Sequence, residues 1–125
     1  ERPGGSIMFF ILYVLNDPDL LDPMINAWEE AGVKGITVLA STGMARLRER
    51  GALREDLPLI PSLDDIIEQY QDTNRTLFTI VQTQEVVHAV VYATEKIVGD
   101  LDAPNTGILV VLPVVQAYGL NRRSD

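Results

Sequence analysis

Residues 7–15, IMFFILYVL, form an unbroken apolar segment rich in aromatic and β-branched side chains. This composition is typical of a β-strand that is covered on one face or on both. Nine residues are far fewer than the roughly 20 that an apolar helix needs to cross a bilayer. Directly after the segment, Asp17 precedes Pro18, which favours a helix with Asp17 as its N-cap. We therefore expect a buried strand followed by a helix.

The next residues continue the pattern of a β-α-β unit. Gly32 ends an amphipathic stretch, and Pro23 within it predicts a kink or a loose first turn. Residues 35–41, GITVLAS, then have the composition of a second strand. The apolar side of the expected helix consists of residues at helical spacing: Leu20, Leu21, Met24, Ile25, Trp28 and Ala31.

The second half of the chain repeats this order. A strand is expected at residues 76–82, a helix at 84–98 and an apolar strand at 107–115. Two such units predict an α+β ferredoxin-like sandwich: a four-stranded antiparallel sheet with two helices on one face. Because the helices cover one face only, we expect the bare face to pack against sister subunits. Pro113 indicates a bulge or a sheet edge late in the last strand.

The two halves are joined by a long connection, residues 42–75, which exceeds the needs of a simple hairpin. Ser62 and Asp65 form a capping box there, so a short extra helix is expected after it. Residues 43–61 are the candidate functional loop. We expect residues 1–6 to be a flexible leader and residues 7–125 to form a single domain.

Composition excludes several classes of function. Eighteen acidic against ten basic residues give a net charge of −8, which argues against a general nucleic-acid or anionic-lipid surface. The chain has no cysteine, so disulfides, thiolate metal sites and thiol nucleophiles are excluded. Its one histidine, His88, excludes a multi-histidine metal site within one chain. We expect a soluble, cytoplasmic protein without membrane insertion.

Arg46, Arg48, Arg50 and Arg54 place four of the ten cations within nine positions of the candidate loop. Guanidinium groups bind oxyanions through two parallel hydrogen bonds, so this cluster could hold a phosphate or an acidic partner. The alternative is a solvated loop whose arginines pair weakly with neighbouring carboxylates. The residues alone leave both interpretations open.

A second candidate is the turn before the last strand, Asn105-Thr106-Gly107. It can offer a side-chain amide, a hydroxyl and accessible backbone N–H groups to an anion. The alternative is a plain turn whose conformation is supplied by Gly107. No lysine accompanies it, and no catalytic constellation or nucleotide fingerprint is present elsewhere, which favours a binding protein over an enzyme.

The chain resembles the nitrogen-regulatory PII signalling proteins from Met8 to about Leu120. The resemblance is carried by the order of the elements and by GVKGITV, residues 32–38, leading into Gly43-Met44-Ala45-Arg46. It implies a compact homotrimer that binds adenine nucleotides in clefts between neighbouring subunits. There the base of a long T-loop meets the loop before the last core strand, and the T-loop changes shape with the ligand to grip or release a target protein.

The resemblance also implies roles for individual residues. The effector site would include Thr37, Gly43, Met44, Arg46, Asn105, Thr106 and Gly107, and Arg48, Arg50 and Arg54 would belong to the partner-binding loop. The sequence departs from the family where Ala45 and Leu47 replace a glycine and a glutamine, and where the family's phosphate-loop lysine is absent. Other PII-like relatives bind cyclic dinucleotides or sense bicarbonate, so the scaffold tolerates changed ligands.

The expected function is therefore a PII-like regulator that binds a small anionic effector, such as an adenine nucleotide, and acts on an unidentified target protein. Two alternatives use a related sandwich scaffold, and the first of them is trimeric. One is a CutA-type metal-binding protein, in which His88 would join symmetry-related copies. The other is a small enzyme with acids and bases shared between subunits.

Overall fold

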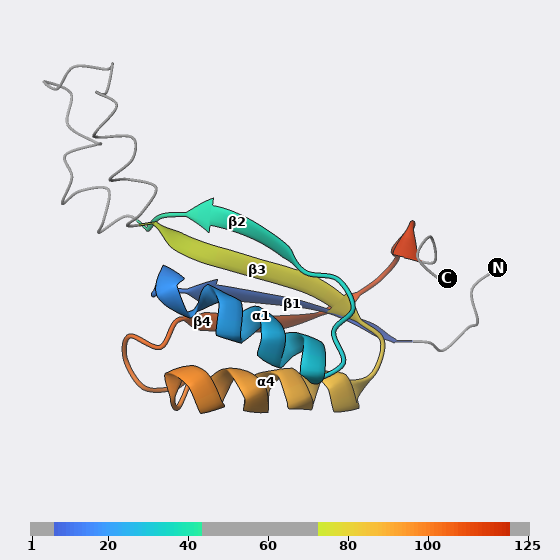
Figure 1. Cartoon of the computed structure of the whole chain (residues 1–125). Coiled ribbons are helices and arrows are strands. Elements are labelled where there is room, and N and C mark those ends of the chain that lie inside the picture. Colours follow the sequence, from blue (N-terminus) through green and yellow to red (C-terminus); the bar gives the residue numbers. More distant parts are fainter. Residues whose placement is uncertain (1–6, 44–72, 121–125) are drawn as a thin grey trace, which may run out of the picture.

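The computed structural model describes residues 7–43 and 73–120 of the 125-residue chain (Figure 1). The expected leader at 1–6, the helix after Ser62 and the loop from residue 44 onward lie outside these residues. In chain order the elements are β1 (Met8–Leu15), a 3₁₀ turn (Pro18–Leu20), α1 (Leu21–Glu30), β2 (Thr37–Ser41), β3 (Asn74–Val81), α4 (Gln84–Val98) and β4 (Ile108–Val114).

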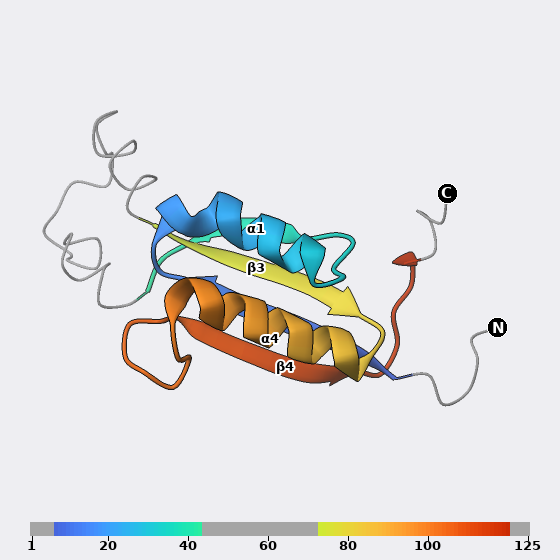
Figure 2. The same ribbon diagram turned by 60° about the horizontal axis from the view of Figure 1, so that its bottom comes forward.

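The four strands form one antiparallel sheet in the order β2-β3-β1-β4. Helices α1 and α4 lie side by side on one face of it, as Figure 2 shows. The expected ferredoxin-like fold is therefore confirmed. β2 and β4 are the edge strands, so Pro113 lies in an edge strand, where a missing N–H is tolerated.

The core lies between the sheet and the helices. Trp28 of α1 and Tyr13 of β1 are its largest fully buried side chains. The two helices are joined by a buried hydrogen bond of 2.9 Å from Trp28 Nε1 to Thr94 Oγ1, and the Thr94 hydroxyl donates to the carbonyl of Val90 at 2.7 Å. Every buried side-chain nitrogen and oxygen in the described residues has a hydrogen-bond partner, which fits a well-packed core.

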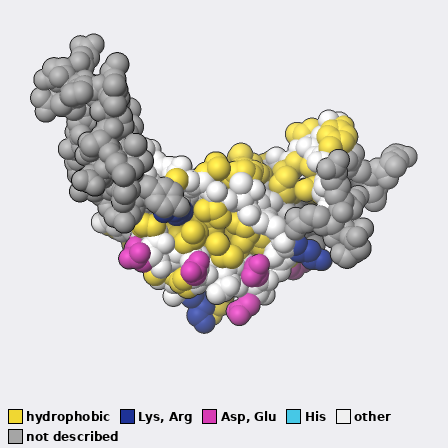
Figure 3. All heavy atoms as spheres, turned by 45° about the horizontal axis from the view of Figure 1, so that its top comes forward, with side chains coloured by type: hydrophobic (Ala, Val, Ile, Leu, Met, Phe, Trp, Pro, Cys, Tyr) yellow, Lys and Arg dark blue, Asp and Glu magenta, His cyan; other side chains and the backbone are white. Residues whose placement is uncertain are grey.

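The opposite face of the sheet is apolar and bare. Leu39, Ile108 and Leu112 on this face are 51%, 62% and 51% exposed. The rings of Phe10 and Phe78 lie 5.6 Å apart on it, and the strand pairing places no charged residue of the described strands on this side. Figure 3 shows hydrophobic side chains across the middle of the molecule and acidic ones along the lower border of the view. The single chain thus covers one face of β1, and packing of the other against sister subunits stays a prediction.

The first helix begins later than the sequence predicts: Asp17 caps the 3₁₀ turn Pro18–Leu20, and α1 starts at Leu21 without a side-chain cap. Asp17 Oδ1 accepts the N–H of Asp19 at 3.0 Å, and the 3₁₀ turn precedes α1. Pro23 therefore falls in the first turn of α1, where its missing N–H costs no helical bond. The end of the long connection needs correcting: it was expected to reach residue 75, but Asn74 and Arg75 already belong to β3.

None of the helices in the described part of the chain is both long and apolar enough to span a membrane.

Candidate functional site

The predicted effector residues fall into three places. Thr37 begins β2, Gly43 lies just beyond its end, and Asn105, Thr106 and Gly107 form the turn that enters β4. The remaining predicted residues lie outside the described part of the chain: Met44, Arg46, Arg48, Arg50 and Arg54.

β2 ends and β4 begins at the same end of the sheet but at opposite edges (Figure 1), so Gly43, just after β2, and the turn before β4 are separated by the width of the sheet. β3 and β1 separate the two edge strands, and neighbouring strands are about 4.8 Å apart, so the edges are about 14 Å from each other. One chain therefore does not bring the two groups together. A shared cleft of the expected kind needs a second copy.

The turn at residues 99–107 is held together by its own groups. Thr106 is 8% exposed, and its hydroxyl lies 2.9 Å from the carbonyl oxygen of Ala103 and 3.3 Å from that of Leu101. The hydroxyl therefore donates within the turn. Gly107 has a φ of +94°, and a Cβ there would lie 2.3 Å from the carbonyl oxygen of Val14. Both residues are thus used by the turn itself, and Asn105 is the exposed member of the predicted trio.

The same turn is acidic. Asp100 accepts the N–H of Asp102 at 2.9 Å, and Glu95 accepts the N–H of Leu101 at 3.0 Å. Residues 99–107 contain no lysine or arginine. Since carboxylates repel anions, positive charge for an anionic ligand must come from another part of the chain or from another copy.

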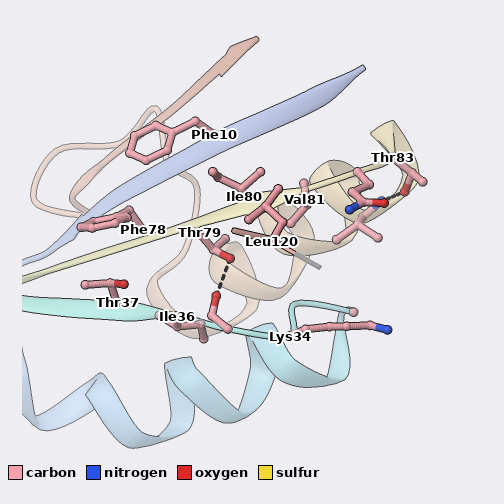
Figure 4. A pocket seen from close by; sticks show the side chains of 14 residues that line it. Phe10, Lys34, Ile36, Thr37, Phe78, Thr79, Ile80, Val81, Thr83 and Leu120 are labelled. Atoms are coloured by element: carbon pink, nitrogen blue, oxygen red, sulfur yellow. Dashed lines mark hydrogen bonds between the residues drawn. The ribbon is translucent and has the colours of Figure 1, made fainter. Parts of the chain in front are cut away.

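A cavity of about 760 Å³ lies beside the start of β2, where the chain joins the sheet at Thr37. β2 pairs with β3 only as far as Phe78, whereas β3 continues to Val81, so the end of β3 is open on that side. The Thr79 hydroxyl donates to the carbonyl of Gly35 at the floor of this opening (Figure 4). The volume falls in the range of small-molecule sites, about 300–1,000 Å³.

The lining of the cavity combines apolar and polar groups. Phe10 and Phe78 supply aromatic rings, and Thr37 is the one predicted effector residue among the lining side chains. Polar groups are contributed by Lys34, Gln82 and Thr83, and further apolar ones by Ile36, Ile80, Val81, Val86 and Leu120. This lining suits a flat, largely apolar ring system with polar edges.

Sequence reasoning found Thr37 but missed the cavity. The signal that was available is the pair Gly32 and Gly35 just before the strand, since both line the cavity. Gly32 has a φ of +115°, a backbone conformation that residues with a side chain rarely adopt, and it lies in the turn between α1 and β2.

The metal-site alternative gains no support within one chain. His88 is exposed on α4. Among residues 7–43 and 73–120, no group of three or more His, Asp or Glu side chains is placed to hold a metal ion. Met24 and Trp28 are core residues, fully buried between the layers.

The fold is that of the PII signalling proteins. Two solved structures of B. subtilis GlnK, a PII-family protein, have it. Its ATP complex is 14% identical to the chain with a TM-score of 0.51, covering 86% of this chain and 82% of GlnK. The other GlnK structure is also 14% identical, with a TM-score of 0.52, covering 88% and 87%. No protein-family model and no curated protein matches the sequence. The resemblance to the PII proteins is thus confirmed at the level of the fold.

Proposed function

We propose that the chain is a PII-like regulatory protein of the cytoplasm, not an enzyme. It binds a small anionic effector, an adenine nucleotide, in clefts between the copies of a homotrimer. Through the loop at residues 43–61 it regulates a target protein. The loop changes shape when the ligand binds, and this change makes it bind or release the target. The observation that carries the proposal is the cavity at the open end of β3, which contains Thr37 in a chain with the PII fold.

The cavity supports a purine base as the buried part of the ligand. A planar ring can lie against the apolar side chains around Phe10 and Phe78. The backbone of β3 beyond Phe78 has no strand beside it on the β2 side, so its polar groups can bond to the edge of a base. The related fold of B. subtilis GlnK has been solved as an ATP complex, which agrees with this class of ligand.

The phosphates require the arginine cluster. The turn at residues 99–107 contributes carboxylates and no cation, so Arg46, Arg48, Arg50 and Arg54 are the concentrated source of positive charge. In the sequence, Arg46 follows Ser41, the last residue of β2, by five positions, and Thr37 begins the same strand. Charge-assisted bonds from guanidinium groups to phosphate are among the stronger polar contacts available to a protein.

The bare apolar face supports the trimer. A contiguous apolar surface of this kind on a soluble domain marks an interaction site. Three copies packed through this face would bury Leu39, Ile108 and Leu112 and bring the β2 edge of one copy near the β4 edge of the next.

Calorimetry with ATP, ADP and AMP tests the proposal, with cyclic dinucleotides and bicarbonate as competing effectors. Wild-type protein should bind an adenine nucleotide. Replacing all four arginines of the cluster by alanine should weaken ATP binding about tenfold or more, since each lost charge-assisted bond contributes about 1.5–3 kcal/mol. The control is Lys96→Ala, which removes an exposed cation lying over Tyr92 on α4 and should leave binding unchanged. Absence of binding to any adenine nucleotide at millimolar concentration refutes the nucleotide proposal.

A further inference from the structure

We infer that Tyr13 is a positioning residue that holds the turn at residues 99–107 in a fixed shape before any ligand arrives. Its effect on ligand binding rests on the proposed function, whereas its effect on the turn does not. Tyr13 lies in β1, is 0% exposed and donates its hydroxyl to the carbonyl of Thr106, 93 residues further along the chain.

The bond from Tyr13 is the first of a connected set. Thr106, whose carbonyl accepts it, turns its own hydroxyl back to the carbonyl of Ala103. Leu101, at the start of the turn, is bonded through its N–H to the Glu95 carboxylate of α4. The turn is therefore attached at one end to the helix and at the other to the buried strand, where the Tyr13 side chain adds to the backbone pairing of Val14 with Ile108.

Gly107 shows how closely the turn is seated on Tyr13. A Cβ at position 107 would lie 2.7 Å from Tyr13 Oη and 2.9 Å from Tyr13 Cε1. No side chain fits between the turn and the tyrosine, so residues 13 and 107 depend on each other. The glycine that the sequence offered as a ligand residue is thus explained by its contact with Tyr13 and Val14.

Because Thr106 is buried, water cannot readily replace the Tyr13 hydroxyl as the hydrogen-bond donor to its carbonyl, and loss of that donor costs free energy. Burial also raises the pKa of Tyr13 to about 12, so the hydroxyl keeps the proton that it donates well into the alkaline range. A turn that is already ordered loses little conformational freedom when a ligand binds to it. In the proposed cleft, residues 99–107 are therefore the rigid side, and ligand-dependent movement belongs to another segment.

Amide hydrogen exchange on the full chain, without nucleotide, tests the role of Tyr13. The variant is Tyr13→Phe, which keeps the ring and removes the hydroxyl. Amides of residues 101–107 should exchange about tenfold faster in it than in the wild type, because the Thr106 carbonyl loses its donor. The control is Thr94→Val, which removes a different buried hydroxyl, bonded to Trp28 and Val90, and should leave exchange in the turn unchanged.

Equal exchange of the turn in Tyr13→Phe and wild type, or equal acceleration in both variants, overturns the inference. An ATP titration of the same proteins then separates it from the proposed function. Tyr13→Phe should bind ATP about tenfold more weakly and Thr94→Val as the wild type does. If the wild type binds no ATP, the proposed function fails while the exchange result still decides the role of Tyr13. If ATP binds both variants equally while the turn exchanges faster, Tyr13 orders the turn but does not position a ligand site, and that part of the inference is refuted.

Discussion

Replacing Gly107 by alanine should destabilise the protein more than any other glycine-to-alanine change in the described residues. Two separate costs add at this position. Its φ of +94° costs alanine about 1–3 kcal/mol. In addition, the new Cβ lies 2.3 Å from the carbonyl oxygen of Val14, a backbone atom that cannot move without disturbing β1. The turn must lift instead, which breaks the Tyr13–Thr106 bond at a cost of about 1–3 kcal/mol.

The expected loss for Gly107→Ala is thus about 4 kcal/mol, a large part of the roughly 5–15 kcal/mol that stabilises an ordinary domain. Gly99→Ala is the matched control. Gly99 has a φ of +96°, but a Cβ there meets nothing within 4 Å, so only the conformational cost of about 1–3 kcal/mol applies.

Urea unfolding measures the difference, with Trp28 fluorescence and circular dichroism as probes. All samples must have the same protein concentration, because the proposed trimerisation would make the midpoint depend on it. Gly107→Ala should be less stable than Gly99→Ala by about 2 kcal/mol, which is the part due to contact with Tyr13 and Val14. Agreement of the two variants within about 0.5 kcal/mol would refute the reasoning, since contact would then add nothing to conformational cost.

Three further outcomes are expected. Leu112→Asp places a charge on the bare sheet face and should convert the proposed trimer to monomers in light scattering, whereas Tyr92→Asp, on the exposed side of α4, should not. Dissociation by both variants would contradict this. The free energy of unfolding should fall between about pH 10 and pH 12. In this range the unfolded chain releases the Tyr13 proton, whose ordinary pKa is 10.0, whereas the folded state keeps it. In urea titrations, Tyr13→Phe should lose less stability than the wild type across the same range. Thr83→Ala removes the N-cap of α4, whose hydroxyl accepts the N–H of Val86 at 3.2 Å, and should cost about 1 kcal/mol in the same assay; an unchanged midpoint would show that the cap contributes nothing.

The elements that could be predicted from the sequence are those with a strong local pattern. The apolar segment at residues 7–15 became β1, and residues 84–98 became α4 with the same bounds, because an unbroken apolar run and helical spacing are local properties. β2 is shorter than expected. Gly35 and Ile36 precede β2 and do not pair with β3. The hydroxyl of Thr79 donates to the carbonyl of Gly35 where a backbone hydrogen bond between strands was expected.

The candidate site was harder to predict because it depends on contacts between distant residues. The cavity arises because β2 begins to pair with β3 only at Thr37, opposite Phe78, so it depends on residues more than 40 positions apart. The role of Gly107 depends on Tyr13 and Val14 in the first strand. Nothing near Gly107 in the sequence indicates such a contact, so a plain turn and an anion-binding turn look alike there.

The placement of β2 and β4 at opposite edges of the sheet has a consequence for how defects combine. A cleft built from the β2 edge of one copy and the β4 edge of the next joins unlike surfaces, and such a heterologous contact closes only as a ring. In the proposed trimer, each chain therefore serves two clefts. In a trimer made only of chains altered at Arg46, every cleft lacks a functional β2 side. In a trimer made only of chains altered at Asn105, every cleft lacks a functional β4 side. Mixed trimers, however, contain one cleft with both halves intact, so two inactive proteins should regain binding when they are refolded together.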